Sequence, residues 1–132
     1  LFLFVLIWSA DIAAYFSGRR WGQRKLCNKV SPGKSWEGVY GALASSVLMA
    51  LIYAKYSHWQ GVELLIFMSI CIITVLASIL GDLLESLMKR TNNVKDSGSI
   101  LPGHGGVLDR IDSLTAALPI FLSCFWLWET MR

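Results

Sequence analysis

The sequence predicts an all-α protein, a polytopic bundle of about four transmembrane helices with two functional loops on the cytoplasmic side. Hydrophobic residues make up 55% of the 132-residue chain and charged residues only 16%, a balance seldom found in a soluble domain of this size. The apolar residues form four stretches, each near the length needed to cross roughly 30 Å of hydrocarbon. The charged residues gather between these stretches.

The four apolar stretches cover approximately residues 1–16, 39–56, 64–84 and 114–128. Each is expected to be helical, because a sheet edge in lipid would leave backbone groups unpaired. The first stretch opens within an apolar run and shows neither the basic leading region nor the cleavage site of a signal peptide. We therefore expect residues 1–132 to be a single membrane catalytic region, a fragment whose upstream helices are missing.

The basic residues predict the orientation of the helices. Six of the twelve lie between Arg19 and Lys34, and four more lie between Lys89 and Arg110. The short polar segment 57–61 has only Lys55 nearby. Since positive residues favour the cytoplasmic side, the two longer segments are expected there and the short one outside. This explanation of the charge makes a nucleic-acid partner unnecessary.

Two acid pairs flank the second of these segments. Asp82 and Glu85 are three residues apart, as are Asp109 and Asp112, so each pair shares a helical face. Facing each other at the membrane boundary, the two pairs would form a hard oxygen site for Mg²⁺. Alternatively, Glu85 pairs with Lys89 one turn later, and Asp109 caps the last helix.

Asp11 is a further acid among apolar residues. A carboxylate at membrane depth is costly unless it has a partner, so it is by default a candidate functional residue. It either serves the metal site or pairs with a cation on a neighbouring helix.

Two polar segments are candidates for phosphate binding. The turn at residues 102–106 places three glycines around His104, and backbone N–H groups of such turns can approach an anion closely. His104 would contact phosphate or relay a proton, or it is an ordinary loop histidine. In the first segment, Lys34 beside Ser31 can contact phosphate, although Asn28 stands where a P-loop requires glycine.

The run from residue 86 to residue 112 resembles the motif of the phosphatidate cytidylyltransferase (CDP-diacylglycerol synthase) family. The matching pieces are Ser86-Leu87-Met88-Lys89-Arg90, Lys95-Asp96-Ser97-Gly98 and the stretch from Leu101 through Pro102-Gly103-His104-Gly105-Gly106 to Asp112. The upstream pieces Ser9-Ala10-Asp11 and Ser31-Pro32-Gly33-Lys34-Ser35-Trp36-Glu37-Gly38 are similar too. The resemblance covers essentially the whole chain and corresponds to the C-terminal half of a bacterial enzyme.

The resemblance implies a nucleotidyltransferase of phospholipid biosynthesis. Such an enzyme transfers CMP from CTP to phosphatidate, giving CDP-diacylglycerol and pyrophosphate, with Mg²⁺ as cofactor and a second, monovalent cation left open. It implies a multi-pass protein of the bacterial inner membrane whose active site faces the cytoplasm and whose partners are CTP, phosphatidate and the bilayer. A homodimer, and inactivity of the isolated fragment, are left open as well.

The resemblance also assigns roles to individual residues. Asp82 and Asp109 would bind the metal, supported by Glu85 and Asp112. Phosphate groups of the two substrates would be held by basic residues of both polar segments and by the glycine turn. The residues expected to bind substrate or take part in catalysis besides the acids are Ser31, Lys34, Lys89, Arg90, Lys95, His104, Gly105, Gly106 and Arg110.

Two other functions compete with this one. In a transporter, Asp11 and Asp82 would line a cation path, but the glycine turn and the basic segments would then have no role. In a prenol kinase that uses CTP, the product would be a phosphorylated alcohol, so product analysis separates it from a cytidylyltransferase.

Overall fold

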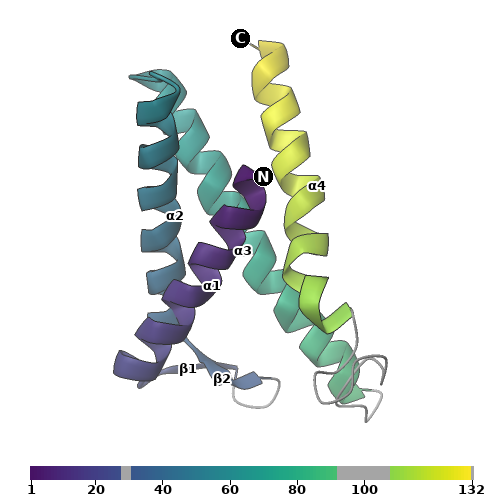
Figure 1. The fold of residues 1–132 in the computed structure, drawn as a ribbon. Helices are drawn as coiled ribbons and strands as arrows, with labels where there is room; N and C mark the ends of the chain where they lie inside the picture. The colour runs from purple at the N-terminus through teal and green to yellow at the C-terminus, as the bar shows by residue number, and fades with distance from the viewer. Residues whose placement is uncertain (28–30, 92–107, 132) are drawn as a thin grey trace.

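Four long helices form most of the protein (Figure 1). The computed structural model describes residues 1–27, 31–91 and 108–131, except for the side chains of Cys27, Pro32 and residues 108–112. All four helices are long and apolar enough to cross a membrane, so the prediction of a multi-pass helical bundle is confirmed. The helices are α1 (Phe2–Trp21), α2 (Trp36–Tyr56), α3 (Val62–Thr91) and α4 (Leu108–Met131).

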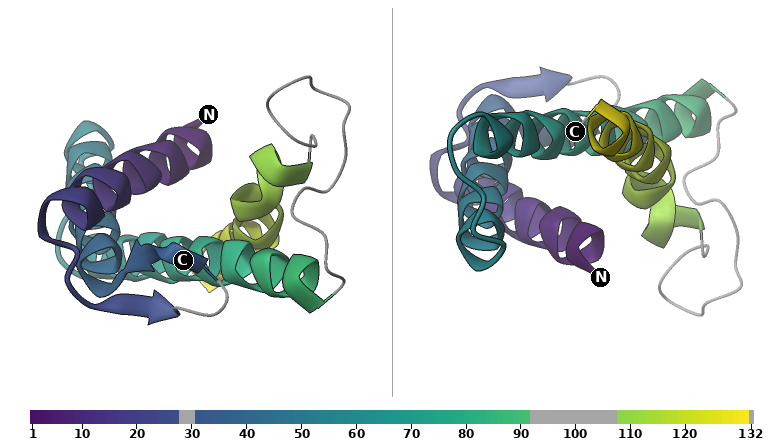
Figure 2. Two further views of the ribbon diagram at one scale, coloured as in Figure 1. Left: turned by 90° about the horizontal axis from the view of Figure 1, so that it is seen from below. Right: turned by 90° about the horizontal axis from the view of Figure 1, so that it is seen from above.

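The arrangement of the helix ends agrees with the distribution of basic residues. The connection between α1 and α2, the end of α3 and the start of α4 all lie at one end of the bundle (Figure 1). The turn between α2 and α3 lies at the other end, with the C-terminus. Viewed along the bundle, α3 lies between α2 and α4, and α1 packs against α2 (Figure 2). The described helix ends that flank the two polar segments therefore share one end of the bundle, as predicted.

Small residues allow α2 to pack closely. Its buried positions are four residues apart along the whole helix: Gly38, Ala42, Ser46, Ala50 and Ala54. A stripe of this kind lets two backbones approach, which is how helices associate in lipid, where burial of apolar surface gives no advantage. The rotation of α2 about its axis is thereby fixed, and with it the position of the segment that precedes α2.

A two-stranded ribbon joins α1 to α2, where the sequence analysis expected a polar loop. Strand β1 (Lys25–Cys27) pairs antiparallel with β2 (Ser31–Ser35). The ribbon satisfies backbone N–H and C=O groups of a polar segment that leads straight back into a helix. We call this end of the molecule the hairpin end. An isolated ribbon of this size is only marginally stable, so contacts with the helices have to hold it in place.

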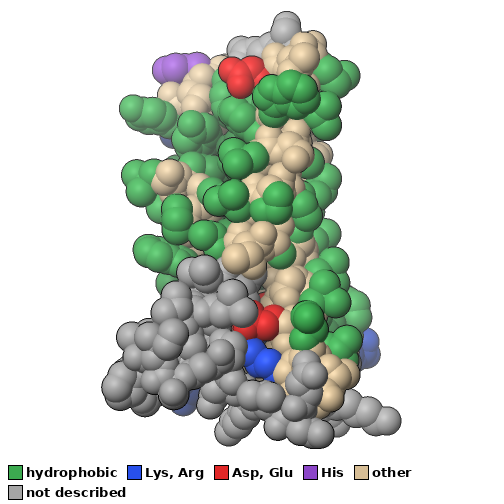
Figure 3. Space-filling view, turned by 90° about the vertical axis from the view of Figure 1, so that its right-hand side faces the viewer, with side chains coloured by type: hydrophobic (Ala, Val, Ile, Leu, Met, Phe, Trp, Pro, Cys, Tyr) green, Lys and Arg blue, Asp and Glu red, His purple; other side chains and the backbone are tan. Residues whose placement is uncertain are grey.

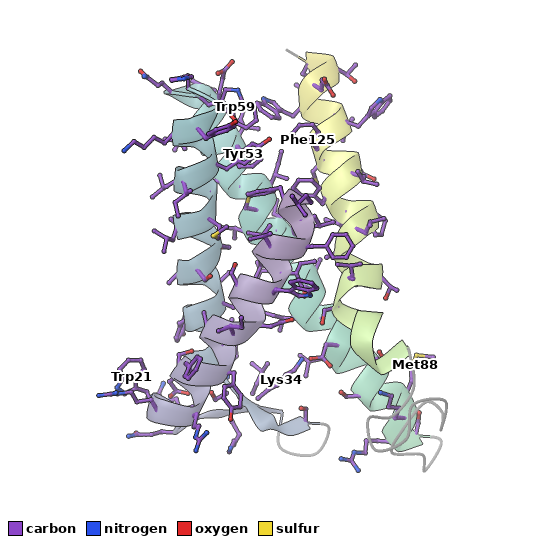
Figure 4. All side chains as sticks on the ribbon, viewed as in Figure 1. Trp21, Lys34, Tyr53, Trp59, Met88 and Phe125 are labelled. Carbon is purple, nitrogen blue, oxygen red and sulfur yellow. The ribbon has the colours of Figure 1, made fainter. Side chains whose placement is uncertain are left out.

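Aromatic rings join the helices at the opposite end, which we call the aromatic end. Phe67 of α3 is 1% exposed. Its ring centroid lies 5.4 Å from that of Phe2 in α1 and 5.3 Å from that of Tyr53 in α2. Trp59, in the turn between α2 and α3, lies 5.0 Å from Phe67 and 4.9 Å from Trp128 of α4. Figure 4 shows Tyr53 and Trp59 together at this end, where rings from all four helices form one cluster.

Candidate active site

A pocket of about 760 Å³ lies at the hairpin end. Its lining comes from α1, both strands, the first turn of α2, the part of α3 around Asp82, and Ser113 near the start of α4. The volume falls in the range usual for small-molecule sites. Figure 3 shows acidic and basic side chains side by side near this end, on a face whose other described side chains are mostly hydrophobic or uncharged. The pocket therefore brings acidic and basic side chains together at the hairpin end.

An ion pair crosses the pocket between two of the residues that the sequence singled out. Lys34 Nζ contacts Asp82 Oδ2. Lys34 lies next to the end of β2, and Figure 4 shows it in the space between the lower parts of α1 and α3. The side chains keep 26% and 33% of their surface exposed, so water screens the pair and still reaches both charges. The structure thus brings the first polar segment and the acid of α3 into one site.

Asp11 lines the same pocket. Its carboxylate interacts unfavourably with the charge of Asp82 and favourably with that of Lys34. Among the described residues, Lys34 of the hairpin is a cation whose charge reaches Asp11. Tyr15 lies one helical turn after Asp11, and Gly18 lies two turns after it. Both residues also line the pocket, so one face of α1 is turned toward the site.

Two carboxylates of the described residues could contribute ligands to a Mg²⁺ site. No cluster of three or more His, Cys, Asp or Glu side chains suited to a metal occurs among the residues that the structure describes. Asp11 and Asp82 do line one pocket. Mg²⁺ commonly takes one or two carboxylates and fills its remaining positions with water and phosphate oxygens. This donor set is adequate when substrate supplies the rest.

Glu85 lies one turn beyond Asp82 and has a partner of its own. Its Oε1 lies 2.7 Å from Nζ of Lys89, which is the pairing that the sequence left open as an alternative. Glu85 and Lys89 are both absent from the lining of the pocket. The pair lies in the part of α3 that continues past its apolar stretch to Thr91, and a metal role for Glu85 stays a prediction.

Several predicted site residues fall outside the described part of the chain. Lys95, His104, Gly105 and Gly106 lie there entirely. Asp109, Arg110 and Asp112 lie in the first turns of α4, whose backbone is described and whose side chains are not. The convergence of the two acid pairs therefore stays a prediction. Of the remaining residues, Ser31 pairs with Cys27 in the ribbon, and Arg90 is exposed in the last turn of α3.

Glu37 joins the ribbon to α2. The backbone N–H of Arg24 donates to both carboxylate oxygens of Glu37, at 3.3 and 3.4 Å. The carbonyl of Arg24 accepts from the N–H of Trp36 at 3.0 Å. Ser35 caps the helix, because its Oγ accepts from the N–H of Gly38 at 3.2 Å. The N–H and the carbonyl of Arg24 are thus both hydrogen-bonded to the first turn of α2. These bonds fix the ribbon that carries Lys34.

Sequence reasoning did not assign three further pocket residues, Tyr15, Arg19 and Lys25. The basic residues of this segment were interpreted as a signal of membrane orientation. The spacing of Asp11, Tyr15 and Arg19, four residues apart in each step, is the signal that could have identified them, since it places all three on one helical face.

The fold and the pocket define a class: multi-pass membrane proteins that hold a charged pocket at one end of a helical bundle. The cytidylyltransferase family model matches residues 1–128, and the chain belongs to this family.

Individual relatives agree with the family model. A phosphatidate cytidylyltransferase of Haemophilus influenzae is 54% identical over 124 residues, which are 92% of this chain and 43% of the relative. One of Pseudomonas aeruginosa is 55% identical over 122 residues, again 92% of this chain and 45% of the relative. The chain therefore spans less than half the length of these curated relatives.

The fold is also similar to that of a solved structure, described as an intramembrane enzyme for archaeal membrane lipids biosynthesis. The TM-score is 0.68 at 18% sequence identity, with 92% of this chain and 75% of that chain covered. At this identity the likeness supports the fold of the bundle alone.

Proposed function

We propose that this chain is the pocket-bearing part of a phosphatidate cytidylyltransferase, which makes CDP-diacylglycerol and pyrophosphate from CTP and phosphatidate. The observation that carries the proposal is the pocket in which Asp11, Lys34 and Asp82 meet, in a chain that belongs to the cytidylyltransferase family. A transfer between two anions needs cations and metal-binding acids in one place, and this pocket offers both.

The chemistry places few demands on the protein beyond positioning and charge. An oxygen of the phosphatidate phosphate attacks the α-phosphorus of CTP, and the bond to the β-phosphate breaks to release pyrophosphate. The substrate is itself the nucleophile, so an activated serine or cysteine is not required. The protein has to hold two negatively charged groups in line and stabilise the charge that builds on the leaving pyrophosphate.

Residues of this chain can supply these functions. Asp82 would hold Mg²⁺, together with Asp11 and with Asp109 at the start of α4, and the ion would neutralise phosphate charge and favour departure of pyrophosphate. The Lys34 ammonium, which pairs with Asp82 in this structure, would turn to a substrate phosphate when that carboxylate binds the metal. Ser31, Lys89 and Arg90 remain candidates for phosphate contacts at the same end.

We further propose that the hairpin end faces the cytoplasm of a bacterial inner membrane. The basic residues that flank the pocket support this orientation. CTP would then reach the pocket from water, while phosphatidate would approach from the bilayer. Exposed apolar side chains on all four helices give the bilayer a surface to contact.

The proposal is tested with the full-length protein in vesicles that contain phosphatidate, supplied with CTP labelled in the cytosine ring. We expect label in a CDP-lipid and one pyrophosphate for each lipid formed. Asp82→Asn should lower turnover about 100-fold or more, since it removes a carboxylate that would hold Mg²⁺. Glu129→Gln, an exposed acid in the last turn of α4 away from the pocket, is the matched control and should leave turnover unchanged.

Two results would count against this function. A labelled product in water, with no CDP-lipid, would point to another use of CTP. Turnover of Asp82→Asn close to that of Glu129→Gln would remove Asp82 from the site.

A further inference from the structure

One face of α1 lines the pocket. Asp11, Tyr15, Gly18 and Arg19 all belong to the lining, and their spacing of three and four residues places them along a single side of the helix. This face carries an acid within the apolar part of α1 and a base in its last turn. The base, Arg19, has no role in the function proposed above.

Arg19 and its neighbour Arg20 differ in what they contact. Arg19 Nη1 donates to the hydroxyl oxygen of Tyr15, one turn earlier, at 3.1 Å. Arg20 lies outside the pocket lining, and its Cζ stands 5.4 Å from the ring centroid of Trp21. The two residues have the same charge at the same helix end, so a comparison of the two isolates the effect of facing the pocket.

The Tyr15 contact leaves Arg19 able to bind an anion. A guanidinium group has five N–H donors in a planar fork that matches phosphate, and Tyr15 takes one of them. The tyrosine oxygen accepts from Arg19, so its own O–H stays available to donate to a ligand. Hydrogen bonds polarise one another in such a chain, and donation to a charged oxygen is strengthened.

A second cation stands at the same pocket. Lys25 of β1 lines it, and the described part of the chain shows neither Lys25 nor Arg19 in an ion pair with a carboxylate. Lys34, by contrast, is neutralised by Asp82. Among the described lining residues, Arg19 and Lys25 are thus the cations that no acid offsets through an ion pair.

We propose that Arg19, oriented by Tyr15 and supported by Lys25, is a phosphate-binding arm of the pocket, separate from the Lys34–Asp82 pair. The inference rests on the proposed function, because it assigns the arm to a phosphate of one of the two substrates. Phosphatidate and CTP share this chemistry. The experiment therefore measures the KM of phosphatidate and the KM of CTP separately.

The experiment uses the full-length protein in phosphatidylcholine vesicles, with CTP and the mole fraction of phosphatidate varied in turn. Arg19→Ala should raise the KM of one substrate about tenfold or more, the effect of losing a charge-assisted contact, with kcat within about threefold. Arg19→Lys keeps the charge but lacks the planar guanidinium fork, so its KM should lie between those of Arg19→Ala and the unsubstituted protein. Tyr15→Phe should raise the same KM about two- to threefold. Arg20→Ala is the control and should stay within about twofold of the unsubstituted protein.

The outcomes separate the two sources of phosphate. A higher KM for phosphatidate alone assigns the arm to the lipid headgroup, and a higher KM for CTP alone assigns it to the nucleotide. Equal KM values in Arg19→Ala and Arg20→Ala would overturn the proposal. Direct binding of CTP and of fluorescent phosphatidate is measured alongside. The affinities of the variants for these ligands then test the role of Arg19 even where turnover is absent. Absence of turnover in the unsubstituted protein counts against the proposed function alone.

Discussion

The aromatic end and the hairpin end of the bundle are held together by different interactions. At the aromatic end, rings from all four helices pack around Phe67, which is almost completely buried. At the hairpin end, α1 and α4 diverge in both views of the bundle (Figures 1 and 2). The contacts described there include an ion pair, a helix cap and two long hydrogen bonds to a carboxylate.

This difference indicates how the protein combines stability with a polar site. In lipid, helices associate through close packing and not through burial of apolar surface. The ring cluster supplies that packing away from the pocket, so the hairpin end can stay open and keep charged groups partly hydrated. The stability of the fold should therefore depend mainly on the aromatic end, and substrate binding should depend on the hairpin end.

Phe67→Ala is expected to have the largest effect on stability. The change removes a buried ring that contacts three of the other helices and should lower the free energy of unfolding by about 3 kcal/mol. Thermal unfolding of the full-length protein in detergent micelles measures this loss. Phe4→Ala, at a ring that is 41% exposed, is the matched control and should cost less than about 1 kcal/mol.

The same pair of variants can contradict the division between the two ends. KM values for both substrates should be unchanged in the folded fraction of Phe67→Ala. A large rise in either KM, without a loss of stability greater than that of Phe4→Ala, would mean that the aromatic end shapes the pocket directly.

Gly41→Ala is expected to have an intermediate effect, because it disturbs the packing of α1 against α2 near the hairpin end. A Cβ at Gly41 would lie 2.1 Å from Ser17 Oγ and 2.9 Å from the carbonyl oxygen of Ala13. The second contact is with backbone, so α1 and α2 would have to separate, at a cost of about 1–3 kcal/mol. Gly33→Ala adds the same methyl where nothing lies within 4 Å, and its unfolding in the same micelles should match that of the unsubstituted protein. Equal stability of the two variants would show that close packing of α1 on α2 is not required.

The membrane helices could be predicted from the sequence because the signal is local. A long apolar stretch in lipid has to be helical wherever its neighbours lie, and Lys and Arg orient it. Apolarity alone does not predict that α3 continues to Thr91, whereas the four-residue spacing of Glu85 and Lys89, which form an ion pair, is typical of a helix. The ribbon was missed because pairing between Lys25 and Ser35 depends on residues separated in the chain.

The sequence predicted individual candidate residues for the site, but it did not predict which of them contact one another. Asp11, Lys34 and Asp82 each stood out, the two acids through the cost of charge in an apolar run. Their meeting depends on how α1, α2 and α3 are rotated about their axes, which the packing of the helices in three dimensions determines. Arg19 and Arg20 illustrate the limit: they are adjacent in sequence and alike in chemistry, and only the rotation of α1 places one of them at the pocket.

Glu37→Ala is expected to have the smallest effect on stability and to act only at the hairpin end. Its two hydrogen bonds to the N–H of Arg24 are long and exposed, so their loss should cost about 0.5–1 kcal/mol. Exchange of the Arg24 amide hydrogen should become about two- to fivefold faster, since that free energy is the cost of opening the contact. Glu37→Gln keeps one acceptor oxygen and should restore much of the protection. Because the ribbon carries Lys34, the KM of a substrate should rise with the exchange rate across the three proteins. Faster exchange with no change in either KM would show that Lys34 is positioned by its contact with Asp82 alone.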